Sequence, residues 1–346
     1  MVAFTSKDVA RIAGVSQSTV SYVMTGKRPI SERTRQRVLA AMEQLTYEPN
    51  AGARALAGRR TQVVGLVVPF GVGSEVAGLL PFIETIASSA RANDHEVLLV
   101  TADEGSAGLR RLAGRALCDA IVMMDIREQD ERVPVAASLP IPVVLVGVPD
   151  DSAGLYCVDL DFEAAPRMAV DELVDTGHDE VVVVGYPAAA MERKVNFVGR
   201  FLGSAHRQAE VRGLPLTVLE PVELGRVAAA QAVERVLLRR GRGRLGLLVP
   251  YSAVMGSMLH ALRSLGVVPG RDISLIGVST DRQAEESEPS YTNVSEEPRD
   301  VSRRAMETLF WLLDPGPGVG HPAVDLVAPR LTRRGTVMPA PKPPTP

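Results

Sequence analysis

Residues 14–27 read GVSQSTVSYVMTGK, a glycine turn followed by a short stretch of helical periodicity. Gly14 is suited to end one helix and Ser16 to cap the next, in which Val20 and Val23 point inward. The residues before the turn carry a Thr-x-x-Asp spacing, which is typical of a capping box at a helix start. Two short helices joined by a glycine turn predict a helix-turn-helix unit, whose second helix enters the major groove of DNA.

A third helix is expected to begin near Ser31 and to complete an all-α headpiece over residues 1–48. It repeats apolar residues at helical spacing, namely Val38, Leu39, Met42 and Leu45. The first helix has a matching apolar face, made of Val9, Ala10, Ile12 and Ala13. Three short amphipathic helices can together enclose one small core.

The outward side of the second helix carries hydrogen-bonding side chains rather than charges. Its candidates for contacts with base edges in the major groove are Gln17, Ser18 and Tyr22. The phosphates are expected to bind the hydroxyl and basic residues around them, namely Thr5, Ser16, Thr19, Ser21, Thr25, Lys27, Ser31, Arg33 and Thr34. This division leaves the second helix free to discriminate bases while its flanks supply the positive charge.

The charge distribution also favours a module that binds a polyanion. Residues 1–60 hold ten Lys and Arg against four Asp and Glu, a net charge of +6. The rest of the chain holds 28 basic and 37 acidic residues, a net charge of −9. A small basic head on a larger acidic body fits a nucleic-acid-binding domain, and a chance asymmetry of solvated charges is the alternative.

Three segments together resemble the LacI/GalR (lactose-repressor) family of bacterial transcription factors: KDVARIAGVSQSTVSYVMTGK, SERTRQRVLAAMEQLTYEPNAGARALAG and VVGLVVP. The resemblance implies a hinge over residues 49–60 that folds on DNA beside its dimer mate, with a leucine wedge in the minor groove. The hinge residues implied to contact DNA are Asn50, Ala53, Arg54, Leu56 and Ala57. The segment is too short for a stable isolated helix, and a flexible basic linker is the alternative.

From Val63 onward, short β-branched runs alternate with helical stretches, which predicts parallel sheets covered on both faces. The helices are expected over 75–92, 106–116, 129–138, 162–176, 190–212, 225–239, 252–265 and 298–313. The pattern resembles the family's periplasmic-binding-protein-like body over 61–335, two doubly wound α/β subdomains with a ligand cleft at the carboxyl ends of the strands. The expected segments are about 61–160 and 291–322 for the first subdomain, and about 161–290 and 323–335 for the second.

The predicted effector cleft departs from the family pattern. Sugar-binding members usually carry Asn-Asp after the strand that matches LGLLV, where this chain has Pro250-Tyr251, and an acidic pair after SLIGV, where it has Ser279-Thr280. Arg193 matches the family's ligand-binding arginine. The residues expected at the effector site are Phe70, Asp125, Asp161, Arg193, Tyr251 and Ser279.

Two interpretations of this cleft remain open. In one, it binds a non-sugar ligand, flat or anionic, stacked on Tyr251 or Phe70 and held by Arg193. In the other, the pocket is degenerate and the protein acts without an effector. Asp125 and Asp161 can also serve simply as strand-end or helix-cap groups.

Other classes of function find little support in the sequence. A Gly71-x-Gly73 pair after the first strand lacks the third glycine of a dinucleotide fingerprint, and the histidines show no metal-ligand spacing. No enzyme activity, cofactor or metal is therefore expected. Cys118 and Cys157 lie in apolar runs and are expected to be buried, reduced thiols, and no stretch predicts a membrane span or signal peptide. These features favour a cytoplasmic, nucleoid-associated protein.

The C-terminal residues 336–346 are proline-rich and expected to be disordered, without the leucine heptads of a tetramer-forming coiled coil. The expected assembly is therefore a homodimer, with candidate interface residues on the helix over 77–92, namely Leu79, Leu80, Phe82, Ile83 and Ile86. Together the patterns predict a dimeric repressor of a near-palindromic double-stranded DNA operator, with a small-molecule effector as a further partner. The alternatives are an architectural DNA-bending protein without an effector and a solute-binding protein.

Overall fold

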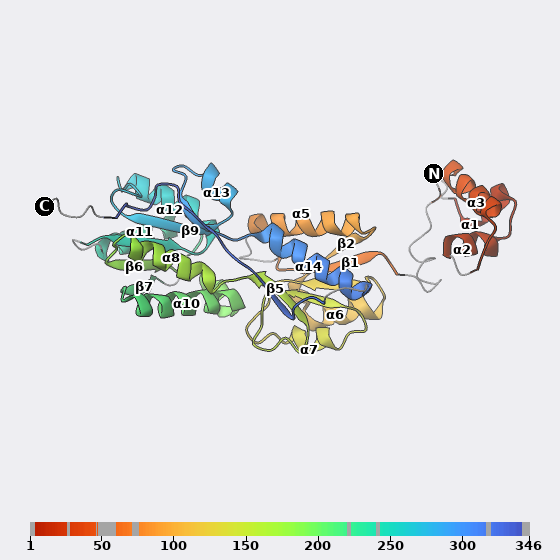
Figure 1. Cartoon of the computed structure of the whole chain (residues 1–346), viewed down its shortest axis with the longest axis horizontal. Coiled ribbons are helices and arrows are strands. Elements are labelled where there is room, and N and C mark those ends of the chain that lie inside the picture. The colour runs from red at the N-terminus through yellow and green to blue at the C-terminus, as the bar shows by residue number, and fades with distance from the viewer. Residues whose placement is uncertain are drawn as a thin grey trace.

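The computed structural model describes residues 4–25, 28–45, 47, 60–70, 76–219, 223–239, 243–315 and 320–340. Three short helices form the headpiece, and a larger α/β body follows (Figure 1). The headpiece helices are α1 (Ser6–Ala13), α2 (Gln17–Thr25) and α3 (Glu32–Gln44). None of the helices in the described part of the chain is long and apolar enough to cross a membrane.

Local polar contacts begin and end α1. The backbone N–H and hydroxyl of Thr5 both donate to the carboxylate of Asp8, at 2.9 and 2.8 Å, which confirms the predicted capping box. Gly14 ends the helix with φ 63°, a left-handed conformation that favours glycine. Arg37 from α3 donates to the carbonyls of Ala13 and Gly14, so the third helix also ties down the turn.

The small core of the headpiece comes from all three helices. Its buried residues are Val9, Ala10, Ala13, Val20, Val38, Ala41 and Leu45. Two residues expected on the apolar faces lie outside this core, since Ile12 is 37% and Leu39 is 48% exposed. Helices this short have only a narrow buried stripe, and both side chains fall at its edge.

The described residues of the body form two six-stranded sheets. Sheet 1 has the order β11-β5-β4-β3-β1-β2 and sheet 2 the order β12-β10-β9-β8-β6-β7. The strands of sheet 1 are β1 (Val63–Val68), β2 (Glu96–Thr101), β3 (Ala120–Met123), β4 (Val143–Val146), β5 (Tyr156–Leu160) and β11 (Val324–Val327). Those of sheet 2 are β6 (Glu180–Val184), β7 (Leu216–Leu219), β8 (Leu245–Val249), β9 (Ser274–Ser279), β10 (Thr292–Ser295) and β12 (Leu331–Thr332). Every pairing is parallel except that of β10 with β12, so the predicted doubly wound α/β class is confirmed.

Helices cover the faces of both sheets (Figure 1). Those of the first subdomain are α5 (Val76–Ala92), α6 (Gly105–Gly114), α7 (Arg132–Ala137) and α14 (Pro298–Leu313). Those of the second are α8 (Ala164–Asp175), α9 (Ala188–Glu192), α10 (Asn196–Arg212), α11 (Arg226–Arg239), α12 (Ser252–Ser264) and α13 (Asp281–Glu286). The single helix expected over 190–212 is thus two helices, with a break that brings Arg193 to the junction between the subdomains.

The expected crossings between the subdomains near Tyr291 and residue 323 were placed too early. Strand β10 pairs with β9 and therefore belongs to the second subdomain, and the chain crosses only after Ser295. Strand β11 pairs with β5 and belongs to the first, and the last crossing follows Val327. Both strands have only four residues, too few for a clear hydrophobic pattern.

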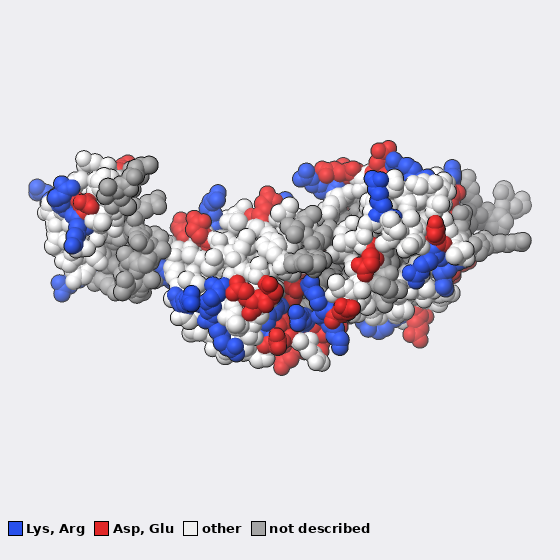
Figure 2. Space-filling model, turned by 180° about the vertical axis from the view of Figure 1, so that it is seen from behind, with Lys and Arg blue, Asp and Glu red and all other residues white. Residues whose placement is uncertain are grey.

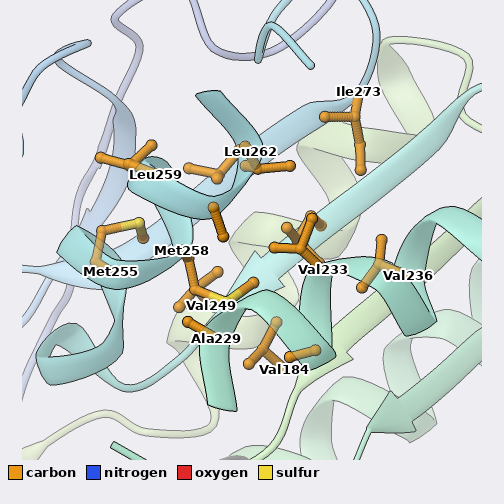
Figure 3. Packing of buried hydrophobic residues seen from close by; sticks show 14 of the residues in the cluster. Val184, Ala229, Val233, Val236, Val249, Met255, Met258, Leu259, Leu262 and Ile273 are labelled. Carbon is orange, nitrogen blue, oxygen red and sulfur yellow. The ribbon is translucent and has the colours of Figure 1, made fainter. Parts of the chain in front are cut away.

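The core of the second subdomain shows how the helices are held against the sheet. Figure 3 shows Val233 and Val236 of α11 and Met258 and Leu262 of α12 directed into one cluster beside the strands. These side chains are fully buried. The continuous apolar strands of the sequence predict this packing, because strands that are buried on both faces need helices that turn apolar side chains toward them.

The two cysteines have the environment that the sequence predicts. Cys118 and Cys157 are buried and free, as predicted, and burial raises the pKa of each thiol to about 11.

The expectation of disorder from residue 336 is wrong for residues 336–340. Thr336 is buried and its hydroxyl donates to the carbonyl of Leu275 at 2.8 Å, while its own carbonyl accepts the Leu275 N–H at 2.8 Å.

Candidate DNA-binding surface and effector cleft

The predicted base-reading residues lie on the outer side of α2. Gln17 and Ser18 are exposed and Tyr22 is half-buried. The side-chain amide of Gln17 donates to the hydroxyl of Ser6 at 2.8 Å, which holds it beside the first turn of α1. Ser16 caps α2 by accepting the Thr19 N–H at 3.1 Å. The sequence places these side chains together because one helical face repeats every three to four residues.

Tyr22 has a basic neighbour that the sequence does not place beside it. The guanidinium carbon of Arg28 lies 5.4 Å from the centroid of the Tyr22 ring, within cation–π range. A positive charge therefore lies against the aromatic residue of an otherwise uncharged helix.

The predicted phosphate-binding residues are distributed around α2 and the start of α3. Ser31 caps α3, since its hydroxyl accepts the Thr34 N–H at 3.3 Å, and Arg33 is exposed beside it. Figure 2 shows Lys and Arg prominent on the headpiece, whereas both signs alternate over the body. Among the predicted DNA contacts, the side chain of Thr25 and all of Lys27, Asn50, Ala53, Arg54, Leu56 and Ala57 lie outside the described residues.

A cavity of about 230 Å³ lies between the two subdomains, at the carboxyl ends of the strands. Asp125, Arg193 and Tyr251 all line it. Asp125 follows β3, Arg193 follows α9 and Tyr251 follows β8, so the fold brings together residues that are far apart in the sequence.

Asp125 and Arg193 form an ion pair across the junction of the subdomains. Asp125 is 10% and Arg193 is 33% exposed in the side chain. Backbone hydrogen bonds run beside them, from Glu128 N–H to the Lys194 carbonyl at 3.1 Å and from Asn196 N–H to the Ile126 carbonyl at 3.1 Å. The arginine expected to hold a ligand is therefore already neutralised by a carboxylate of this chain.

Three other predicted effector residues do not line the cavity. Phe70 packs against the core of the first subdomain. Asp161 accepts the N–H groups of Glu163 and Ala164, at 3.1 and 2.8 Å, at the start of α8, which is the helix-cap alternative. Ser279 is fully buried and accepts a hydrogen bond from the Tyr291 hydroxyl at 2.9 Å.

The cavity has four polar lining residues that sequence reasoning missed, namely Asp159, Asn196, Ser252 and Glu296. Asp159 accepts a hydrogen bond from Arg200 at 2.7 Å, and burial raises its pKa to about 7 although Arg200 lowers it. Asn196 is 3% exposed, and its side-chain nitrogen has no hydrogen-bond partner. A charged residue inside the apolar run YCVDL was an available signal for Asp159.

An aromatic cluster forms one wall of the cavity. Phe162 and Phe197 stack with ring centroids 5.0 Å apart, and both line the cavity with Tyr251. Tyr186 lies behind them, 5.9 Å from the ring of Phe197 and 5.9 Å from that of Tyr251. Phe197 lies in the first turn of α10, and the other three rings follow β5, β6 and β8, so separate elements contribute the aromatic surface of this wall.

Comparison with protein-family models gives two matches. Residues 5–50 match the model for bacterial regulatory proteins of the lacI family, and residues 170–337 match a periplasmic binding protein-like domain. The first match covers the headpiece, and the second covers most of the second subdomain together with α14 and β11.

Curated relatives align over most of the chain. Catabolite control protein A of Priestia megaterium is 29% identical over 308 residues, which span 87% of this chain and 90% of that protein. The lactose operon repressor of Escherichia coli (strain K12) is 24% identical over 314 residues, 88% of this chain and 83% of that protein.

Among solved structures, that of the Lac repressor dimer bound to operator and an anti-inducer has a TM-score of 0.81. The similarity covers 97% of this chain and all of that one at 21% sequence identity, which is a likeness of fold.

Proposed function

The chain belongs to the LacI family of bacterial regulatory proteins, DNA-binding regulators of transcription, and on that premise we propose that it is a dimeric repressor of a near-palindromic operator. The observation that carries this proposal is the headpiece itself. Its α2 presents Gln17 and Ser18 to solvent, while basic and hydroxyl groups lie around them. We place its site of action at the nucleoid, in the cytoplasm.

Dimer formation would place two headpieces on two half-sites, as the symmetry of a near-palindrome requires. The related Lac repressor is a dimer on its operator in the solved structure. Of the candidate interface residues, Leu80 is 58% exposed, whereas Ile86 is fully buried and Leu79 and Phe82 line the cavity. Leu80 is therefore the strongest interface candidate on α5.

The hinge residues would act between the headpieces. Leu56 is proposed to enter the minor groove at the centre of the operator and to unstack a base step, with Asn50, Ala53, Arg54 and Ala57 around it. An effector in the cleft would change repression only if it binds one arrangement of the subdomains more tightly than another.

The proposed operator is tested by selecting DNA sites that the protein binds and then footprinting the protein on them. We expect a protected near-palindrome and a dimer on DNA by analytical ultracentrifugation. Protection spread evenly over random sequence would instead support the architectural alternative.

Leu56→Ala tests the hinge on the operator that this selection yields. It should weaken operator binding and remove the DNA bend seen by gel mobility, because the wedge is lost. Leu238→Ala, an exposed leucine on α11 of the body, is the matched control and should leave the bend in place. Unchanged bending by Leu56→Ala would refute the wedge.

A further inference from the structure

The charged groups around the cavity are already paired within the chain. Arg193 binds Asp125, and Asp159 binds Arg200. Tyr251 and Glu296, which also line the cavity, have partners as well. The lining holds a single guanidinium against three carboxyl groups, so an anionic ligand would meet no available positive charge.

One polar group at the cavity lacks a partner. Among the described residues, the buried side-chain polar atoms without a hydrogen bond are His95 Nε2, Asn196 Nδ2 and Arg244 Nε. Only Asn196 also lines the cavity. A buried donor without a partner destabilises the protein. A ligand that supplies the acceptor removes this cost, which favours binding of that ligand.

Gly147, which has no side chain, lies beside this nitrogen. A Cβ atom placed on Gly147 would lie 3.4 Å from Asn196 Nδ2 and 2.8 Å from Ile126 Cβ. Gly147 lines the cavity and therefore leaves room beside the donor. The residues facing this space are otherwise mostly apolar, including Phe82, Met124, Ile126, Val146, Leu160 and Val195.

We propose that the cavity binds a neutral, flat and largely apolar small molecule that carries a hydrogen-bond acceptor for Asn196. The stacked wall of Phe162, Phe197 and Tyr251 takes the flat face, and the amide of Asn196 fixes its orientation. A sugar would bury several hydroxyl groups, and the lining side chains, which are mostly apolar, offer partners to only some of them, which is unfavourable. This inference rests on the proposed effector cleft and assigns the chemical class of its ligand.

Titration calorimetry on the full chain tests the class with four probes. Coumarin is a neutral bicyclic lactone, and 2H-chromene has the same skeleton without the carbonyl. Coumarin-3-carboxylate adds a negative charge, and methyl α-glucopyranoside represents sugars. We expect coumarin to bind about tenfold more tightly than 2H-chromene, and the charged probe and the sugar to bind more weakly than either.

Two variants separate the roles of the donor and the rings. Asn196→Leu keeps a similar volume without the donor and should weaken coumarin about tenfold while leaving 2H-chromene unchanged. Its melting temperature should not fall, because the unpaired donor is gone. Tyr251→Leu should weaken both probes alike. Asn93→Leu, away from the cavity, is the matched control and should change neither affinity.

The outcomes are decisive for the ligand class. Three results would each overturn the proposed ligand class. Coumarin could fail to bind, coumarin-3-carboxylate or the glucoside could bind more tightly than coumarin, or Asn196→Leu could bind coumarin with full affinity. Operator affinity is measured separately, with and without coumarin. If coumarin binds as expected but operator affinity is unchanged, the effector role in the proposed function fails while the assigned ligand class stands.

Discussion

At the scale of single residues, the contact between Tyr22 and Arg28 places a positive charge beside an otherwise uncharged helix. Tyr22 is proposed to read a base edge, and the Arg28 guanidinium over its ring would supply the charge. A Tyr hydroxyl and ring edge favour a thymine methyl or an acceptor, whereas a guanidinium favours guanine.

Tyr22→Arg should therefore shift the preferred operator toward G at the base pair beneath this residue, by about 1–3 kcal/mol of discrimination. Selection of binding sites from a random library, with wild type in parallel, gives the comparison. Leu39→Arg, an exposed position on α3, adds the same charge elsewhere and should leave the preference unchanged. An identical selected sequence for Tyr22→Arg would end the assignment of Tyr22 to base reading.

Asp159 predicts a dependence of stability on pH. Burial raises its pKa to about 7, so the folded protein retains a proton that the unfolded chain, with a pKa of 3.8, has released. Stability from this group is thus present at low pH and lost as pH rises toward about 7. Compared with Asp159→Asn, the wild type should lose on the order of a few kcal/mol of unfolding free energy between about pH 4 and 7. Denaturant unfolding at a series of pH values measures this, and a constant difference would contradict it.

Residue-level prediction from sequence succeeded where the signal was local. The capping box at Thr5 and Asp8 depends on a spacing of three residues, and the structure contains it. Asp161 was expected at the effector site, with a strand-end or helix-cap role as the alternative, and the structure shows the alternative, since its carboxylate accepts the Ala164 N–H at the start of α8. Asn196 could not have been singled out, because an unpaired amide is visible only once its neighbours are placed.

At the scale of elements, the cavity is lined by residues from the break between α9 and α10 and from the loops after β3 and β4. Gly147 follows β4 with φ 129°, a conformation that an L side chain rarely adopts. Its neighbour Ile126 leaves no room for a methyl group there. The glycine therefore permits both the backbone path and the open space beside Asn196.

Gly147→Ala should lower the free energy of unfolding by roughly 1–3 kcal/mol through backbone strain and the contact with Ile126. It should also reduce binding in the cavity. Gly114→Ala is the matched control, because a Cβ there meets nothing within 4 Å and lies in a helix. That variant should be neutral or stabilised by about 0.5–1 kcal/mol in the same denaturation assay. Equal stability of both variants would contradict the assigned role of Gly147.

Elements with strong periodicity were predicted, and short ones were not. Most strands and helices of the body appear where the sequence pattern expects them, since apolar runs and helical faces are local signals. Strands β10 and β11 were assigned to the wrong subdomains, because strand pairing is a property of the whole sheet. The break in 190–212 depends on contacts with the other subdomain, which one helical pattern cannot reveal.

At the scale of the whole molecule, the pair of Asp125 and Arg193 connects the two subdomains across the cavity. An ion pair that is one-third exposed on one side contributes modestly, because water screens it. The position of the pair therefore matters more than its energy. It joins the loop after β3 to the segment after α9, whose separation the proposed effector would change.

Asp125→Asn should lower the free energy of unfolding by about 1 kcal/mol. Glu307→Gln, in the pair with Arg303 whose side chains are about half exposed, is the matched control and should cost about 0–0.5 kcal/mol. Denaturant unfolding of both variants provides the comparison. A cost for Asp125→Asn no larger than the control would remove this pair from the contacts that hold the subdomains together.

The chain crosses between the subdomains after β5, after β10 and after β11, and this route limits how the molecule can be divided. A protease that cuts one crossing leaves the lobes joined by the others. Each lobe is assembled from separate stretches of the gene, so a continuous fragment cannot encode a complete one. Expression of an isolated lobe would require a rearranged gene in which those stretches are fused, with new loops where the crossings now run.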